Sequence, residues 1–283
     1  MLRRFASIIG LAALLSVAAT ADQLVNTGLP DGKLGALSRT GSGGLLETEA
    51  ADDFILNTPA LITGASFYGL IGSTVSLSDI SQVVAEIYRV FPKDSDTVRT
   101  PNVPTRTNSP SDVAFGSRDS SVPDLSFSAT SLGLFAVGNS VVNGINPKPN
   151  QTTGGEGPVS GQEVLFDVTF TTPFLLPADH YFFVPQVTVP GDFLWLSAPR
   201  PIVAPGTPFA PDLQAWIRNE NLAPDWLRIG TDIVGSPVTG GPAPTYNLAF
   251  TLDGTSVPEP SSYILLGSAI LAFAAAGRKK LKG

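Results

Sequence analysis

Apolar and polar residues alternate along several stretches of the chain with a period of two, which is typical of strands that bury one face. In residues 164–171 the sequence VLFDVTFT places Val and Phe on one side. In residues 246–252 the sequence YNLAFTL repeats the pattern. Runs rich in β-branched and aromatic residues predict further strands at 53–56, 61–70, 83–91, 180–189 and 193–197.

Helical periodicity is scarce. Residues 212–219 could form one short helix with Asp212 as its N-cap. Gly and Pro together make up 53 of the 283 residues, so turns come at short intervals. Two long polar stretches, 92–123 and 143–161, separate the strands. This pattern predicts an all-β exported domain, an antiparallel β-sandwich or jelly roll, because a parallel sheet would need helical crossovers.

The N-terminus has the three parts of a secretion signal. Arg3 and Arg4 precede an apolar run at 8–15, and Ala19 and Ala21 supply the small residues that signal peptidase accepts. We expect a signal helix and cleavage after Ala21. The alternative, a native N-terminal helix, is disfavoured because the apolar run is too short to stay in a bilayer.

The C-terminus also has three parts in order. Val257, Pro258, Glu259 and Pro260 are followed by an apolar stretch at 263–276 and then by a basic end, GRKKLK. This arrangement resembles the PEP-CTERM sorting signal of Gram-negative bacteria. The resemblance implies processing by exosortase, a membrane protease, and association with exopolysaccharide or biofilm.

The physics of this tail agrees with a processing signal. The two prolines keep the chain extended, which leaves a backbone that a protease can bind. At 1.5 Å per residue the apolar stretch forms a short transmembrane helix of about 21 Å, against about 30 Å of hydrocarbon. Its basic end would stay in the cytoplasm. An ordinary anchor that is never cut is the alternative.

These signals divide the chain into a signal peptide at 1–21, an exported β domain at 22–256 and a sorting tail at 257–283. The exported domain keeps eleven of the seventeen basic residues and 23 of the 24 acidic ones, so its formal net charge is about −12. Such a charge disfavours nucleic acid as a partner. The chain has no cysteine, which excludes disulfides and thiolate chemistry.

Candidate catalytic and metal-binding residues are few. His180 is the only histidine, and no serine lies in a nucleophile elbow, so a structural role is favoured over a Ser-His-Asp triad. Asp94 and Asp96 have alternate spacing but lack the rest of a calcium loop. Carboxylate pairs for glycoside hydrolysis could come from several acids, between which spacing cannot choose. These are Asp52, Asp53, Glu86, Asp167 and Asp192.

The tryptophans raise a binding alternative. Trp195 lies in an apolar run and is expected in the core. Trp216 and Trp226 lie among charged and amide residues, so they could form either core or a glycan-binding surface. Separately, the segments 51–54 and 62–69 resemble the opening strands of a β-sandwich found in exported bacterial proteins, which implies a fold but no activity.

We therefore expect an exported, non-enzymatic structural or binding protein with no cofactor and no metal. It would cross the inner membrane, be held there transiently by its C-terminal helix, and reach the envelope surface or the medium. Its expected partners are signal peptidase and an exosortase-type protease, with polysaccharide as a further candidate partner. The alternatives are a carbohydrate-binding module using Trp216 and Trp226, and a secreted hydrolase using carboxylates.

Overall fold

The computed structural model describes residues 21–91, 108–145, 152–199 and 212–257. It is mostly β, with 55% strand and 4% helix, and its strands form two antiparallel sheets, one of them nearly closed. The expected all-β sandwich is confirmed. The signal helix, the tail helix, Asp94 and Asp96 lie outside the described residues.

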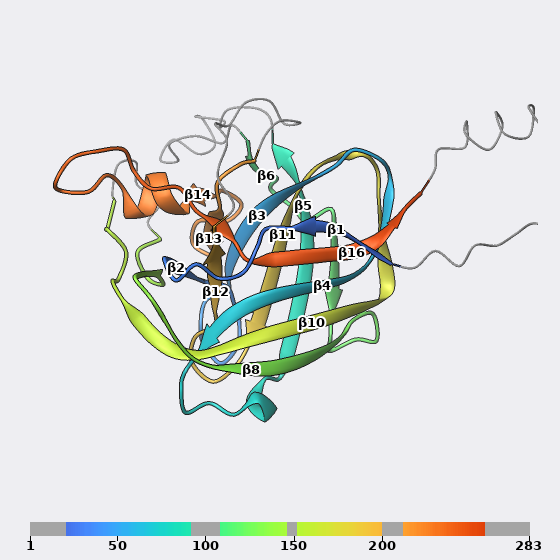
Figure 1. Ribbon diagram of the computed structural model, residues 1–283, viewed down its shortest axis with the longest axis horizontal. Coiled ribbons are helices and arrows are strands. Elements are labelled where there is room, and N and C mark those ends of the chain that lie inside the picture. The colour runs from blue at the N-terminus through green and yellow to red at the C-terminus, as the bar shows by residue number, and fades with distance from the viewer. Residues whose placement is uncertain (1–20, 92–107, 146–151, 200–211, 258–283) are drawn as a thin grey trace, which may run out of the picture.

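The first sheet has nine strands among the described residues. They are β1 (Asp22–Asn26), β2 (Leu34–Leu37), β4 (Ala60–Ile71), β8 (Ser126–Val137), β9 (Asn139–Val141), β10 (Val159–Leu176), β12 (Leu194–Ala198), β15 (Asn247–Leu248) and β16 (Phe250–Ser256). The long strand β4 has β10 on one side and β16 and β12 on the other, and β10 in turn pairs with β8. Figure 1 shows β4, β10 and β8 crossing the view together.

The second sheet has seven strands within the described ranges. They are β3 (Thr48–Leu56), β5 (Gln82–Phe91), β6 (Ser109–Pro110), β7 (Gly116–Asp119), β11 (Asp179–Thr188), β13 (Trp216–Asn219) and β14 (Leu227–Arg228). Two short helical segments complete the described chain, η1 (Leu77–Asp79) and η2 (Ile229–Val234). In Figure 1, β5 and β11 run steeply behind the strands of the first sheet.

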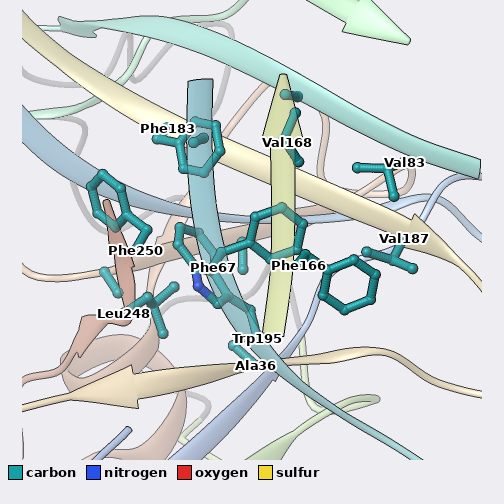
Figure 2. Packing of buried hydrophobic residues seen from close by; sticks show 14 of the residues in the cluster. Ala36, Phe67, Val83, Phe166, Val168, Phe183, Val187, Trp195, Leu248 and Phe250 are labelled. Atoms are coloured by element: carbon teal, nitrogen blue, oxygen red, sulfur yellow. The ribbon is translucent and has the colours of Figure 1, made fainter. Parts of the chain in front are cut away.

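The main core lies between the sheets and is rich in aromatic side chains. Phe67 and Phe166 stack with ring centroids 4.9 Å apart, and Phe193 packs edge-on against both. From the second sheet, Phe183 contacts Phe67 and Trp195 (Figure 2). Each such pair adds about 0.5–1.5 kcal/mol to the burial of the rings, so the sheets are held together by a network of rings.

One glycine makes this packing possible. A Cβ on Gly69 would lie 1.8 Å from a ring carbon of Phe193, which is fully buried. Because a buried ring has nowhere to move, only glycine fits at this position of β4.

Two sequence-based assignments need correction. The helix predicted for 212–219 is wrong: residues Trp216–Asn219 form β13, which pairs with β3 through Trp216 and Ala51. Sheet pairing and burial of Trp216 outweigh the local capping signal. The single strand predicted at 246–252 is split, because β15 pairs with β12 whereas β16 pairs with β4.

Candidate functional site

The last strand of the sheet ends directly at the predicted sorting motif. β16 pairs with β4 as far as Ser256, opposite Ala60. The next residue, Val257, still donates its backbone N–H to the carbonyl of Pro59 at 2.7 Å. The folded domain is therefore attached to Pro258 without an intervening linker, although Pro258, Glu259 and Pro260 themselves lie outside the described residues.

The predicted signal-peptide cleavage site lies at the same corner. β1 begins at Asp22, the first residue of the predicted mature chain, and Asp22 pairs with Gly254 of β16. Ala21 is exposed, and Ala19 lies outside the described residues. Both predicted processing points are thus within a few residues of one antiparallel strand pair, β1 and β16, which Figure 1 shows next to each other near the middle of the view.

A second candidate site is a buried polar network on the outer face of the second sheet, made of Glu49, Glu86, Tyr88 and Arg218. Arg218 donates to both carboxylate oxygens of Glu49, from Nε to Oε2 and from Nη2 to Oε1 at 3.1 Å. Its Nη2 also donates to the Tyr88 hydroxyl at 2.8 Å. That hydroxyl lies 2.6 Å from Glu49 Oε1 and 3.0 Å from Glu86 Oε2. The four side chains thus form one connected set.

The rest of the guanidinium is also in contact with the protein. Nη1 donates to the carbonyls of Asp112 and Pro224, each at 3.1 Å. The guanidinium carbon lies 4.3 Å from the centroid of the Trp226 ring, a cation–π distance. Arg218 therefore joins the sheet to the segments that cover it.

Burial changes the ionisation of this network. Burial raises the pKa of Glu86 to about 7, and the negative charge of Glu49 acts in the same direction. Burial also raises the pKa of Tyr88, assisted by the charges of Glu49 and Glu86. For Arg218 burial acts to lower the pKa, but its hydrogen bonds to Glu49 and the charge of Glu49 outweigh burial and raise it. Within the network, Glu49 and Glu86 lie beside the one guanidinium of Arg218, and the pKa of Glu86 lies near neutrality.

The geometry of the two acids does not suit glycoside hydrolysis. Glu49 and Glu86 both contact the same Tyr88 hydroxyl, at 2.6 and 3.0 Å, so the Tyr88 side chain lies where a sugar would have to pass between two catalytic carboxyls standing roughly 5 to 9.5 Å apart. Arg218 also occupies both oxygens of Glu49. The arrangement instead resembles a buried ion pair between Arg218 and Glu49. Beside this pair lies a second carboxyl, Glu86, whose raised pKa favours its protonated form.

The other predicted carboxylates are dispersed. Asp53 contacts Nε2 of His180 at 2.6 Å, and both side chains are buried. Asp52 is fully buried and accepts from the backbone N–H of Leu248. Asp192 forms an ion pair with Arg39. Asp167 lies on β10 beside Asp253, whose pKa is raised by burial and by the Asp167 charge. Of the five acids, only Glu86 belongs to the network.

The two candidate glycan-binding tryptophans are core residues. Trp216 is 2% exposed and Trp226 is fully buried. The Trp226 Nε1 donates to the carbonyl of Ser111, and its ring packs edge-on against Tyr88. Neither indole offers an open face to a sugar, because the backbone around Ser111 and Asp112 packs over this side of the sheet. Trp195 is also buried, and its Nε1 donates to Ala249.

The outer face of the first sheet carries a small hollow of about 240 Å³. Its lining is mainly apolar and includes Leu70, Val142, Val159 and Leu194, with Asp192 at the side. This volume lies below the roughly 300–1,000 Å³ of typical ligand pockets. Among the described residues no group of three or more His, Asp or Glu could hold a metal ion, and no helix of this part of the chain is long and apolar enough to cross a membrane.

Sequence reasoning missed most of the polar network. Glu86 was named only as one acid among several, and Glu49 and Arg218 were not singled out. The one local signal is that Glu86 and Tyr88 lie two apart on a strand and so share a face.

Comparison with known proteins identifies the tail. No curated protein and no solved structure matches the chain. The family described as the PEP-CTERM protein-sorting motif matches residues 256–280, which begin at the last residue of β16 and include Val257–Pro260. The chain thus carries a PEP-CTERM sorting motif, which implies that it is an exported protein processed at the membrane by an exosortase-type system.

Proposed function

We propose that this protein is a non-enzymatic component of the cell surface or extracellular matrix, delivered as a folded β-sandwich and released from its tail by an exosortase. One observation carries the proposal. The sorting motif follows β16 directly, and Val257 is still hydrogen-bonded to the sheet. A protease acting at Pro258–Pro260 would therefore release the whole sandwich with almost no residual tail.

The polar network supports a structural role for the domain. Each member bonds to at least one other, and Arg218 is further held by two backbone carbonyls. A catalytic carboxyl has to reach a substrate, but Glu49 is only 7% exposed and is paired with Arg218. The half-buried Glu86 is bonded to the Tyr88 hydroxyl. A polysaccharide partner fits the destination that the motif implies, and the charge of about −12 favours neutral or cation-bridged glycans over acidic ones.

The test of sorting uses the full chain in a Gram-negative host that possesses an exosortase. Replacing Pro258, Glu259 and Pro260 by alanine should leave the apolar helix inserted but uncut, so full-length precursor accumulates in the membrane. The matched control is triple alanine replacement at 236–238, an exposed turn that contains Pro237 and Val238. Intact mass and fractionation measure the outcome.

A second variant separates retention from cleavage. Deleting residues 278–282 removes the charges that oppose transfer of the helix, so uncut protein should leave the inner membrane. Wild-type protein that kept its complete C-terminus would contradict the proposal and support a permanent anchor. The glycan partner is tested by screening the exported protein on a glycan array, where binding that survives Trp216→Phe would place the glycan away from this indole.

A further inference from the structure

Strand β8 is the outermost strand of the first sheet on one side. Its only strand partner among the described residues is β10, and no backbone hydrogen bond leads from β8 to another segment in these ranges. Figure 1 shows β8 beside β10 on the side away from β4, with the turn that carries η1 beyond it. One row of its backbone N–H and C=O groups is therefore open to pairing.

This edge lacks the protection that other edges in the described structure have. None of the twelve residues of β8 is charged, and none is proline. By contrast, β1 begins with Asp22, β7 ends with Arg118 and Asp119, and β9 and β14 have only three and two residues. Charges, prolines and short length are common means of preventing edge-to-edge association. β8 has none of these, and its one protective feature is a bulge.

A bulge divides β8 into two parts. Register with β10 shifts between Glu163 and Val164, where Leu132 is the additional residue and Gly133 has a φ of 106°. The regular part, Ser126 to Ser131, is six residues long, which is the common length of a strand. Leu132 in the bulge and Leu134 beyond it are 49% and 84% exposed, so apolar surface continues past the regular part.

The inner side of β8 is incompletely covered. Phe127 and Ala129 pack against the main core but are only partly buried. A further strand beside β8 would cover them, because neighbouring strands lie about 4.8 Å apart and their same-face side chains touch.

We infer that β8 pairs antiparallel with β8 of a second copy of this chain, about a two-fold axis perpendicular to the sheet. This symmetry keeps the inner faces of both sheets on the same side, so Phe127 and Ala129 of each copy extend the core across the junction. Each exported domain has a net charge of about −12, so two copies can approach with least repulsion along an uncharged edge. Because every copy carries the same sorting motif, copies are also delivered to the same place.

The experiment uses the absence of native cysteine. Single substitutions Ser126→Cys, Ser128→Cys, Thr130→Cys and Ser131→Cys, all at exposed positions, are made in the full chain and expressed in an exosortase-possessing host. Exported protein is oxidised and examined on non-reducing gels. Ser73→Cys, in the exposed turn after β4, is the control for random collision.

The amount of disulfide-linked dimer should show a sharp maximum with the position of the cysteine along β8. Near the two-fold axis a residue lies about 5 Å from its own copy, but two residues away the separation grows to roughly 13 Å, beyond the reach of a disulfide. One position or two adjacent ones should therefore give at least about ten-fold more dimer than Ser73→Cys. Adding Ser128→Lys or Thr130→Lys, whichever position is not the cysteine, should return dimer to the control level while circular dichroism stays unchanged.

Because an axis centred on residue 127 or 129 would leave all four positions out of disulfide reach, Phe127→Cys and Ala129→Cys are added. Three outcomes would overturn the inference. Dimer at control level in all six variants would show that the edge is not paired with a second copy. Equal cross-linking at all six would indicate collision without register. An adduct whose mass is that of the chain plus a different protein would assign the edge to another partner.

Discussion

The two faces of the second sheet are both buried but differ in chemistry. The inner face presents Phe54, Ile87, Tyr181 and Phe183 to the first sheet and contains mainly apolar groups. The outer face combines a small apolar cluster around Phe182, Trp216 and Trp226 with the polar network. A sheet buries its second face only where other segments cover it, and here the covering backbone also binds Arg218.

This difference separates two sources of stability. On the inner face, stability follows from area removed from water and from ring packing. On the outer face it depends on keeping charges paired, since an unpaired buried charge costs several kcal/mol. The first kind of burial tolerates small changes of shape, whereas the second fails when one partner is lost.

The largest effect is expected on the inner face. Phe183→Ala removes a fully buried ring that contacts Phe67, Trp195 and Phe250, and should lower the free energy of unfolding by about 3–5 kcal/mol. Urea unfolding of the exported protein measures it. Leu175→Ala, at a residue 62% exposed, should change stability by less than about 0.5 kcal/mol. A similar loss in both variants would mean that the core has been placed wrongly.

The outer face should respond strongly to loss of one charge. Arg218→Met leaves Glu49 without its cation and should cost about 3 kcal/mol. The double variant Arg218→Met/Glu49→Gln removes the orphaned charge as well and should recover at least half of that loss. Urea unfolding of the two variants forms the test, and a double variant less stable than the single one would show that the ion pair is not the main contribution.

A pH dependence should distinguish the two faces. Because folding raises the pKa of Glu86 from 4.5 to about 7, the folded state binds this proton more tightly than the unfolded chain does. The resulting stability is complete below pH 4.5 and is lost as the pH rises to about 7. Glu86→Gln, which imitates the protonated acid, should match wild type at pH 4.5. At pH 8 it should be more stable by about 1–2 kcal/mol, a figure reduced for partial exposure.

The measurement is urea unfolding of both proteins at intervals from pH 4.5 to 8. The difference between them cancels the pH dependence of the other carboxylates. Parallel curves over this range would mean that Glu86 ionises normally.

The smallest effect is expected at His180. His180→Gln keeps an N–H that can donate to Asp53, so stability should fall by only about 1 kcal/mol. Any hydrolytic activity of the exported protein should be unchanged. Loss of such an activity with normal unfolding would support a hydrolase that uses this residue.

The same contrast explains what the sequence could predict. Residues 164–171 lie on a strand with one buried face, so alternation revealed them. β8 was missed because its Ser, Thr and Gly at the sheet border are mostly exposed on both sides. The polar network joins β3, β5 and β13, and Glu49 and Arg218 are 169 positions apart, so no local spacing could bring them together. The sorting motif was predictable because a protease reads it as a continuous segment.

The pairing of β1 with β16 has a mechanical consequence. Asp22 stands opposite Gly254, so the first residue of one strand and the end of the other leave the sheet at the same point. A force that draws the two ends apart would load the hydrogen bonds between these strands one after another instead of all at once. If both the signal peptide and the sorting tail held the protein in the membrane, a small tension would therefore separate β1 from β16. Cleavage at either end removes that tension.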